Sequence, residues 1–364
     1  MAEPRSSGRV VIAIVILTTI AAAGFTYTFL VPNPARDNDG RTTFPGMPYR
    51  ENYTQHSQIV IDGDASLVEL AASEGWPGNG STLRPYVIEG LEVHSADKCI
   101  SINSVQHEHV VIRGCLLWTT SKEFGICLRV SNSSNVEVES CVVHTGLEGI
   151  SAFQSSNLWI QDCGVYDAGF GINASACNNA WIMNCIVLNC TFGVTFVGGF
   201  QVNVFNSRVF SSTVGIMSQF SSYTVVQNCT VAFNERGIDA DEACLNWYIL
   251  ECAVLNNTEV GIEVGPQSNN VTVTVNRIGW NGLNARDDGL TNYWDQGSGN
   301  GNAWSDYSGT GVYVIQGTAG SVDNFPTLLS HQGLSDSSNH STIHKTNIQL
   351  FVGMNSMHPV ANPL

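Results

Sequence analysis

Lysine is almost absent from this chain, and charged residues of either sign are few. Only three of the 364 residues are lysine, charged residues make up 13% of the sequence, and the formal net charge is −16. Proteins that bind nucleic acid neutralise its phosphates with clustered lysine and arginine. The composition therefore argues against a nucleic-acid partner. It favours a solvated acidic surface, with cation binding as the alternative.

Motifs for metal or redox chemistry are also missing. The eleven cysteines form no C-x-x-C pair, and the nine histidines are scattered, with His107 and His109 the closest pair. Soft or imidazole ligands have to be clustered to hold a transition metal. From these residues we expect no metal centre and no cofactor.

One long apolar run lies near the N-terminus. Residues 10–31 carry no charge and follow Arg5 and Arg9. A run of about 20 apolar residues spans a bilayer, and a preceding positive flank stays in the cytoplasm. The sequence predicts a cytoplasmic segment 1–9, a single-pass membrane anchor at 10–31 and an extracellular body. Three alanines at 21–23 leave a cleaved signal peptide as the alternative.

Export agrees with nine N-x-S/T sequons, although an Asn-, Ser- and Thr-rich chain produces such triplets by chance. They begin at Asn52, Asn79, Asn132, Asn173, Asn189, Asn228, Asn256, Asn270 and Asn339. We expect only a few of them to be glycosylated.

Two columns of residues recur through the middle of the chain at intervals of about 22. A glycine followed by Ile or Val stands at Gly125, Gly149, Gly171, Gly193, Gly215, Gly237 and Gly261. A column of small residues stands at Cys115, Cys141, Cys163, Cys185, Ser207, Cys229, Cys252 and Asn276. Short runs that alternate with period two precede the second column. Asparagine, which tolerates a left-handed backbone conformation, stands at or near their starts, at Asn135, Asn157, Asn179, Asn203 and Asn270.

Such a period is typical of stacked supersecondary units. Because 22 residues of period-two alternation leave no room for a helix, each unit is predicted to be a coil of short strands. Parallel coils about 4.8 Å apart place equivalent residues directly above one another, so inward positions need the same small or apolar shape each time. The sequence thus predicts an all-β solenoid over residues 94–280.

The cysteine column is predicted to point into the core as free thiols, because in-register coils aim equivalent side chains the same way, which is poor geometry for a disulfide. A disulfide framework is the alternative. Any bridge is then expected among the cysteines outside the column, Cys99, Cys127, Cys177, Cys190 and Cys244.

The remaining segments are assigned by composition. Residues 32–57 are predicted to be a polar linker, 58–93 an N-terminal cap, 281–328 a C-terminal cap and 329–364 a tail. Within the N-terminal cap, a short helix is expected to begin with a capping box formed by Ser66 and Glu69, and to end at Gly75.

The coils are followed by two motifs, "NYWD" at 292–295 and "GNAWSDY" at 301–307. Together these features resemble the right-handed parallel β-helix of the NosD-like branch of carbohydrate-binding and sugar-hydrolase (CASH) repeat proteins. The entry segment resembles that of archaeal surface members. The resemblance covers residues 58–328 and implies the fold, but the motifs that carry it do not specify a function. It does not extend to copper delivery, because the histidines are scattered. The stretch after the second motif departs from the family pattern in carrying a single acid, Asp323.

Two groups of residues are candidates for chemistry. The first is an acidic cluster beside Arg236 that could serve a lyase or a glycosidase, which needs two carboxylates about 5–9.5 Å apart; its members are Glu235, Asp239, Asp241, Glu242 and Glu263. The alternative is a solvated face or a cation site.

The second group combines acids with tryptophans that could hold Ca²⁺ or a sugar ring, or could simply pack in the cap. Its members are Asp287, Asp288, Trp294, Asp295, Trp304 and Asp306. The sequence as a whole predicts a membrane-anchored cell-surface binding or structural protein with glycans as the favoured ligand. A polysaccharide lyase or glycoside hydrolase is the alternative.

Overall fold

The computed structural model describes residues 35–36, 42–50, 52–297 and 299–330. The predicted anchor at 10–31, the sequon at Asn339 and all of the predicted tail after residue 330 lie outside this part of the chain. Within it, no helix combines the length and the hydrophobicity needed to cross a membrane. Anchoring through 10–31 therefore stays a prediction.

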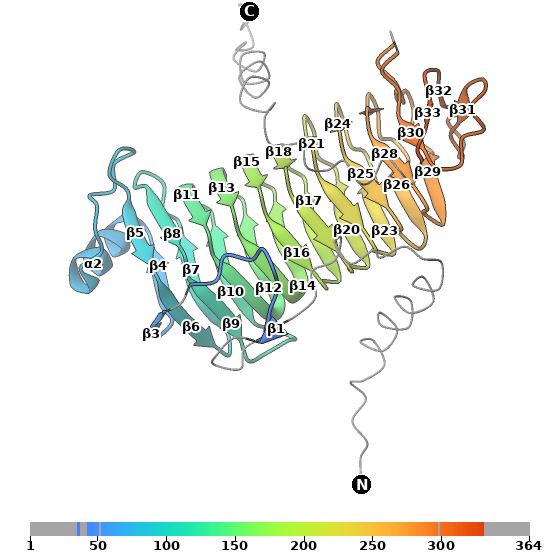
Figure 1. The fold of residues 1–364 in the computed structure, drawn as a ribbon. Coiled ribbons are helices and arrows are strands. Elements are labelled where there is room, and N and C mark those ends of the chain that lie inside the picture. Colours follow the sequence, from blue (N-terminus) through green and yellow to red (C-terminus); the bar gives the residue numbers. More distant parts are fainter. Residues whose placement is uncertain (1–34, 37–41, 51, 298, 331–364) are drawn as a thin grey trace, which may run out of the picture.

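The described chain winds into an elongated stack of parallel coils, a β-helix of the right-handed type with three faces (Figure 1). The first face contains β5 (Tyr86–Glu89), β8 (Val110–Arg113), β11 (Ser134–Glu139), β13 (Ser156–Gln161), β15 (Asn178–Met183), β18 (Phe200–Phe205), β21 (Val225–Gln227), β24 (Tyr248–Leu250) and β27 (Thr272–Thr274). Each strand pairs in parallel with the equivalent strand of the next coil.

The other two faces share the two longest strands, β12 (Val142–Phe153) and β14 (Gly164–Ser175). The second face contains β3 (Thr54–His56), β6 (Leu91–Ser95), β9 (Leu116–Thr119), the first parts of β12 and β14, β16 (Ile186–Leu188), β19 (Arg208–Phe210), β22 (Thr230–Ala232), β25 (Ala253–Leu255), β28 (Arg277–Gly279), β30 (Ala303–Trp304) and β33 (Thr327–Leu328).

The third face contains β4 (Ile59–Asp62), β7 (Lys98–Asn103), β10 (Ile126–Ser131), the second parts of β12 and β14, β17 (Phe192–Val197), β20 (Val214–Gln219), β23 (Arg236–Ala240), β26 (Val260–Val264) and β29 (Leu283–Asp287). Two short antiparallel pairs lie outside the coils: β1 (Ala35–Arg36) with β2 (Thr42–Thr43), and β31 (Tyr313–Val314) with β32 (Val322–Asp323).

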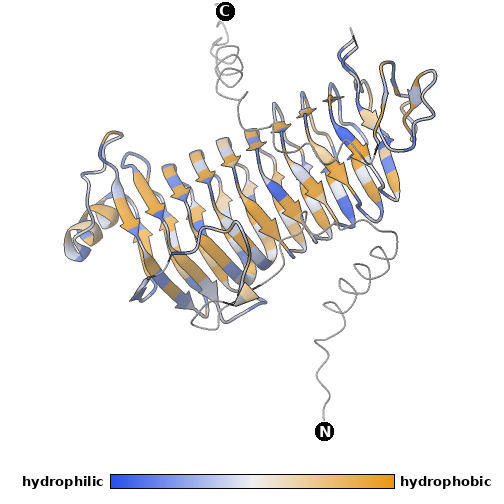
Figure 2. Ribbon diagram, viewed as in Figure 1, coloured by the Kyte–Doolittle hydropathy of each residue, from blue (hydrophilic) through white to orange (hydrophobic). Residues whose placement is uncertain are grey.

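Aliphatic side chains fill the interior because alternate residues of each strand point inward. Along the first face, for example, Ile160, Ile182 and Val204 stand above one another and are fully buried. Figure 2 shows hydrophobic residues along the strands through the whole stack. This continuous core confirms the solenoid predicted from the repeat.

The cysteine column lies at a corner of the coil, where its small side chains form hydrogen bonds with the backbone. The N–H of Cys115 donates to Cys141 Sγ at 3.5 Å, and the N–H of Cys185 donates to Ser207 Oγ at 3.1 Å. All eleven cysteines are buried and free, as predicted for the column. The column also continues beyond Asn276, because Asn276 N donates to Asn302 Oδ1 and Asn302 N to Asp323 Oδ2.

This role gives a prediction for Cys185, whose Sγ donates to Met183 O at 3.3 Å. Cys185→Ser is expected to change the free energy of unfolding by about 1 kcal/mol or less, because a hydroxyl can donate to Met183 O as Ser207 Oγ donates to the equivalent carbonyl, Phe205 O, one coil later. Cys185→Arg is expected to cost about 3 kcal/mol or more, because it buries an unpaired charge. Urea titration of both variants checks this, and a serine variant as unstable as the arginine variant contradicts it.

Glycine recurs in the coils because the backbones approach closely. A Cβ on Gly171 would lie 2.6 Å from Gly193 O, and a Cβ on Gly193 would lie 2.5 Å from Gly215 O. The predicted left-handed asparagines are confirmed at Asn135, Asn157, Asn179 and Asn270. At the fifth position the prediction is wrong: Gln201 takes the left-handed conformation, and Asn203 instead accepts the N–H of Val225.

Helix α2 (Asp64–Glu74) covers the N-terminal end of the stack and buries Leu67 and Ala71. Gly75 ends it in a left-handed conformation, as predicted. The predicted capping box is wrong, because the helix begins before Ser66. The N-cap is Gly63 and has no side-chain cap. Asp64 instead accepts the N–H groups of residues 106–108, which ties the helix to the second coil.

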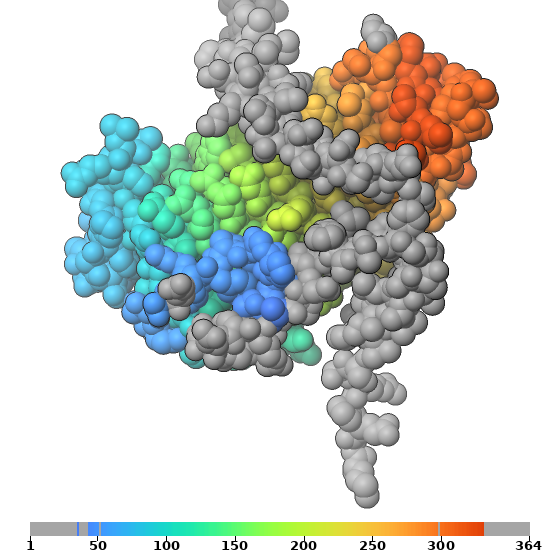
Figure 3. Space-filling view, in the orientation of Figure 1, coloured from blue at the N-terminus to red at the C-terminus, as the bar shows by residue number. Residues whose placement is uncertain are grey.

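The coils extend further at both ends than the repeat indicated. Strand β3 opens the stack inside the segment predicted as a linker, and β29, β30 and β33 continue it inside the predicted C-terminal cap. Residues 44–50, the N-terminal strap, lie on the second face and bury Met47. Figure 3 shows this strap in blue over the green coils. This part of the predicted linker is therefore packed on the coils.

Candidate functional site

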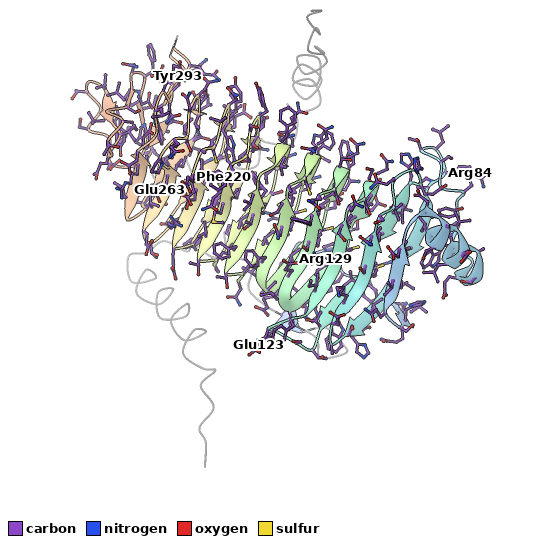
Figure 4. The ribbon with its side chains drawn as sticks, turned by 180° about the vertical axis from the view of Figure 1, so that it is seen from behind. Arg84, Glu123, Arg129, Phe220, Glu263 and Tyr293 are labelled. Atoms are coloured by element: carbon purple, nitrogen blue, oxygen red, sulfur yellow. The ribbon has the colours of Figure 1, made fainter. Side chains whose placement is uncertain are left out.

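The first candidate group lies on the third face. Along its outer row, Met217, Asp239, Glu263 and Arg286 occupy equivalent positions on β20, β23, β26 and β29. The predicted alignment of Asp239 with Glu263 is therefore correct. Figure 4 shows Glu263 on this sheet, with Arg129 several coils away on the same sheet.

Arg236 joins the two carboxyl groups. Its Nη1 lies 2.7 Å from Asp239 Oδ2 and 3.2 Å from Glu263 Oε2. The sum of these two distances limits the separation of the two carboxyl oxygens to about 6 Å. This limit is compatible with the separation of about 5 Å between the carboxyl groups of retaining glycosidases. Arg286 completes the group, with its Nε 4.0 Å from Glu263 Oε1 and 2.6 Å from Asp288 Oδ2.

Asp239 is the unusual member of this group because it is only 1% exposed although it lies on an outer row. Neither of its oxygens accepts a hydrogen bond despite the ion pair with Arg236. Burial raises the pKa of Asp239 to about 7, and the carboxylates of Glu263 and Asp241 add to the rise, whereas Arg236 opposes it. The group thus holds a carboxyl that changes protonation near neutral pH.

The other predicted members of the acidic cluster do not join this pair. Asp241 accepts a hydrogen bond from Gln219 Nε2 at 2.6 Å. Glu235 and Glu242 are exposed, and neither forms an ion pair with a residue that the structure describes. Within this pair, Asp239 is closed off from solvent, whereas Glu263 is partly exposed.

Most of the second candidate group packs inside the C-terminal cap. Trp294 and Trp304 are 1% and 0% exposed. Their indole N–H groups donate to Asp287 Oδ2 and Asp323 Oδ2, each at 2.9 Å. Burial with paired N–H groups, the packing interpretation, is therefore confirmed for both tryptophans.

Two other acids of this group have separate polar partners. Asp288 accepts from Thr318 and Arg286, and Asp306 from Asn284 and Tyr313. The hydrogen bond from the backbone N–H of Thr318 is the main reason that the pKa of Asp288 is lowered. The acids of the second group thus support the packing of the cap and do not converge on one point.

Asp295 differs, because it lines an open cavity of about 410 Å³ at the C-terminal end of the first face. The cavity is lined by Tyr248, Thr272, Tyr293, Asp295, Gln296 and Gly297. We call these six residues the tyrosine slot. Figure 4 labels Tyr293 at this end of the molecule.

The slot follows from the register of three successive coils. Tyr248 pairs with Thr272, and Thr272 pairs with Tyr293, so the two tyrosines occupy the same outer row two coils apart. Tyr248 points outward because Trp247 and Ile249 on either side of it are fully buried. Two coils correspond to about 9.6 Å, twice the strand spacing of about 4.8 Å. Thr272, which stands between the two tyrosines in this row, has a shorter side chain than either of them.

Hydrogen bonds hold the wall of the slot in place. Asp295 accepts from the backbone N–H groups of Gly297 and Asn324 at 2.9 Å and from Asn324 Nδ2 at 2.8 Å. Burial would raise the pKa of Asp295, but these hydrogen bonds outweigh it and the pKa is lowered. Tyr293 is 49% exposed, and Gln296 is exposed, so both can meet a ligand.

Other aromatic residues of the first face differ in kind. Trp159 and Trp181 occupy adjacent coils of the same outer row, and their rings stack on each other at 4.4 Å. Each ring therefore covers one face of the other. Sequence reasoning missed Tyr248 and Tyr293, and only Tyr248, in the middle of the alternating run 247–249, offered a usable signal.

The close histidine pair is not a site either. His107 Nδ1 lies 2.8 Å from Asp64 Oδ2, and His109 Nε2 lies 3.0 Å from Thr82 Oγ1. On the second face, His94 and His144 stack on opposite sides of Trp118. Trp118 separates the two imidazoles.

These features define a parallel β-helix solenoid with capped ends and a polar-aromatic slot at one end. Residues 79–309, more than half of the chain, match the family described as "Periplasmic copper-binding protein (NosD)". The chain belongs to the NosD family. No curated protein sequence matches it.

Solved structures share low similarity with the chain. The periplasmic alginate epimerase AlgG is 15% identical, with a TM-score of 0.39, over 59% of this chain and 63% of the epimerase. An alginate lyase from Paenibacillus sp. str. FPU-7 is 13% identical, with a TM-score of 0.39, over 68% of this chain and 97% of the lyase. Tailspike protein 2 of bacteriophage CBA120 is 13% identical, with a TM-score of 0.42, over 85% of this chain and 50% of the tailspike.

The copper named in the family description finds no matching ligand set in the described residues. Copper sites use clustered imidazole, thiolate or thioether ligands. Across the described ranges, no group of three or more His, Cys, Asp or Glu side chains is placed to hold a metal ion. The cysteine thiols donate to backbone carbonyls, as Cys185 does to Met183 O. Within the part of the chain that the structure describes, the residues present do not fit a copper centre.

Proposed function

We propose that this NosD-family protein binds glycans outside the cytoplasm and that the tyrosine slot receives a sugar ring. The observation that carries the proposal is the slot, in which Tyr248 and Tyr293 stand two coils apart above the short Thr272. Aromatic rings stack on a neighbouring ring at about 4.5–7 Å between centroids. A separation of about 9.6 Å therefore matches one ring placed between the two tyrosines.

The polar groups of the slot favour a sugar over a flat apolar ring. Gln296 and the tyrosine hydroxyls can both donate and accept hydrogen bonds, as the hydroxyls of a sugar require. Binding sites for small ligands typically combine apolar walls with a few such groups. The slot lies at the surface, so a glycan chain can extend into solvent beyond the ring that the slot holds.

The family and the sequons support the proposed location of the body outside the cytoplasm. The family description is periplasmic, which agrees with an exported body. Attachment to the membrane through residues 10–31 stays a prediction, as does glycosylation at the sequons. We propose neither a nucleic-acid partner nor a bound cofactor. Ca²⁺ at the acids of the cap likewise stays a prediction.

A polysaccharide lyase or glycoside hydrolase is the second candidate. It rests on the separation of no more than about 6 Å between Asp239 and Glu263, together with the neutral-range pKa of Asp239. The proposal of binding without cleavage is favoured because Asp239 is closed to solvent, whereas the slot is open.

A glycan-array screen of residues 35–330 tests both candidates when reducing-sugar release is measured alongside it. We expect binding to at least one glycan class without release of reducing ends, and Tyr293→Ala is expected to abolish the signal. Trp159→Ala is the matched control on the same outer row and is expected to retain it. Glycan release that disappears in Glu263→Gln supports the enzyme instead, and an empty array contradicts the proposal.

A further inference from the structure

An apolar row lies on the outer side of the second face, where a β-helix normally meets water. Leu188, Phe210, Ala232 and Leu255 stand in register on four successive coils. Their neighbours Val187, Val209, Val231 and Val254 fill the core, so these four side chains point outward. We call the four residues the apolar strip. All four are nevertheless buried, none more than 3% exposed.

The N-terminal strap covers the same face over the preceding coils. Met47 contacts Gly164, and the ring of Phe44 lies against Tyr166 at 4.9 Å between centroids. At the opposite end, Leu329 lies beside Gly279. Between these two covers lies the apolar strip.

Side chains from beyond the coils reach this face at its two ends. As far as the described residues go, they are Phe44, Met47, Tyr49 and Tyr53 at one end and Leu329 at the other. The strip lies between these two groups and is buried, so it needs an additional apolar cover.

We propose that the apolar strip is the docking site of residues 10–31 of the same chain. The strap ends beside the strip. Gly46 lies beside Ile186, and Phe44 lies against Tyr166, whose register partner on the next coil is Leu188. Because Thr43 pairs with Ala35, the described chain that leads toward residues 10–31 ends about one coil from Leu188, the first residue of the strip.

The length and composition of the run fit the strip. Residues 10–31 carry no charge, and as a helix of 22 residues they would be about 33 Å long. The strip spans three coil steps, about 14 Å. The run is therefore long enough to cover all four residues, and it adds no charge to a surface that already excludes water.

Docking gives the run a second role that excludes the first. A segment that lies on the strip cannot span a bilayer at the same time, so docking competes with the membrane anchor predicted from the sequence. The exposed strip would in turn be an apolar surface on any molecule whose run has entered a membrane. This inference does not depend on glycan binding, which occurs on the first face.

Photo-crosslinking of the full chain tests the docking. p-Benzoylphenylalanine is placed at Phe210, where it replaces a ring with a larger ring, and separately at Leu255. After irradiation, mass spectrometry is expected to find crosslinks to peptides from residues 10–31 within a single chain, and not to peptides from 331–364. The same group at Trp181 on the first face is the control and is expected to give no such crosslink.

Each alternative occupant gives a distinct product that overturns the proposal. These products are a crosslink to residues 331–364, a crosslink between isotopically distinct chains, or a lipid adduct. Deletion of residues 10–31 provides a second readout that requires no substitution in the strip. Binding of the dye ANS is expected to rise several-fold in the deleted chain, and unchanged dye binding by a folded chain also overturns the proposal.

Discussion

Replacing Asp323 with alanine is expected to lower the free energy of unfolding by about 3–5 kcal/mol, because several buried donors lose their acceptor at once. Asp323 is fully buried in the C-terminal cap. Its oxygens accept the N–H groups of Asn302 at 2.7 Å, of the Trp304 indole at 2.9 Å and of Phe325 at 2.9 Å. A urea titration followed by tryptophan fluorescence measures the loss directly, since Trp304 reports on the cap.

Asp323→Asn is the matched control. Asn276 and Asn302 hold the equivalent position in the two preceding coils, each accepting the backbone N–H of the coil before. An asparagine at 323 can keep the bonds to Asn302 and Trp304 and lose only the one to Phe325. We therefore expect it to cost about 1–2 kcal/mol. Equal losses in both variants, or no loss in the alanine variant, would show that the column does not stabilise the cap.

Asp239→Asn is expected to change how stability depends on pH. The folded protein holds the Asp239 proton up to about pH 7, whereas an unfolded aspartate releases it near its ordinary pKa of 3.8. Folding therefore takes up a proton between about pH 4 and pH 7, and stability falls as pH rises through this window. The loss is on the order of 4 kcal/mol for a shift of this size.

The asparagine variant has no such proton, so its stability is expected to stay flatter between pH 4 and pH 7 and to exceed that of the natural protein above pH 7. Thermal unfolding across the pH series measures the difference. Asp241→Asn removes the same charge from a half-buried residue that is hydrogen-bonded to Gln219, and it serves as the control. A natural protein whose stability rises from pH 4 to pH 7, relative to the Asp239 variant, contradicts the account.

The fold was predictable because the coil repeats its inward positions. The column of small residues from Cys115 onward recurs because its side chains accept hydrogen bonds from the backbone of the preceding coil. Glycines such as Gly193 recur because a Cβ would clash with the backbone of the next coil. The ends were less predictable, because β3 and β29 keep the coil geometry without keeping the repeated residues. The role of Ser66 was mispredicted because its spacing to Glu69 does not reveal where the helix begins.

The candidate sites were predictable only in part. The shared row of Asp239 and Glu263 followed from the 24-residue spacing, but that spacing does not reveal that Asp239 is buried. The tyrosine slot could not be found from the repeat, because only 21 residues separate Thr272 from Tyr293 where the coil period breaks. Tyr248 and Tyr293 therefore have no common sequence register, although they share an outer row.

Isothermal titration calorimetry with the best glycan from the array tests the central claim most directly. Residues 35–330 are titrated as the natural sequence, as Tyr248→Ala, as Tyr293→Ala and as the control Trp159→Ala. We predict that each tyrosine variant binds at least tenfold more weakly while unfolding at the same urea concentration, because each removes one wall of the slot, and that the tryptophan variant binds as the natural sequence does. Unchanged affinity in both tyrosine variants would contradict the account.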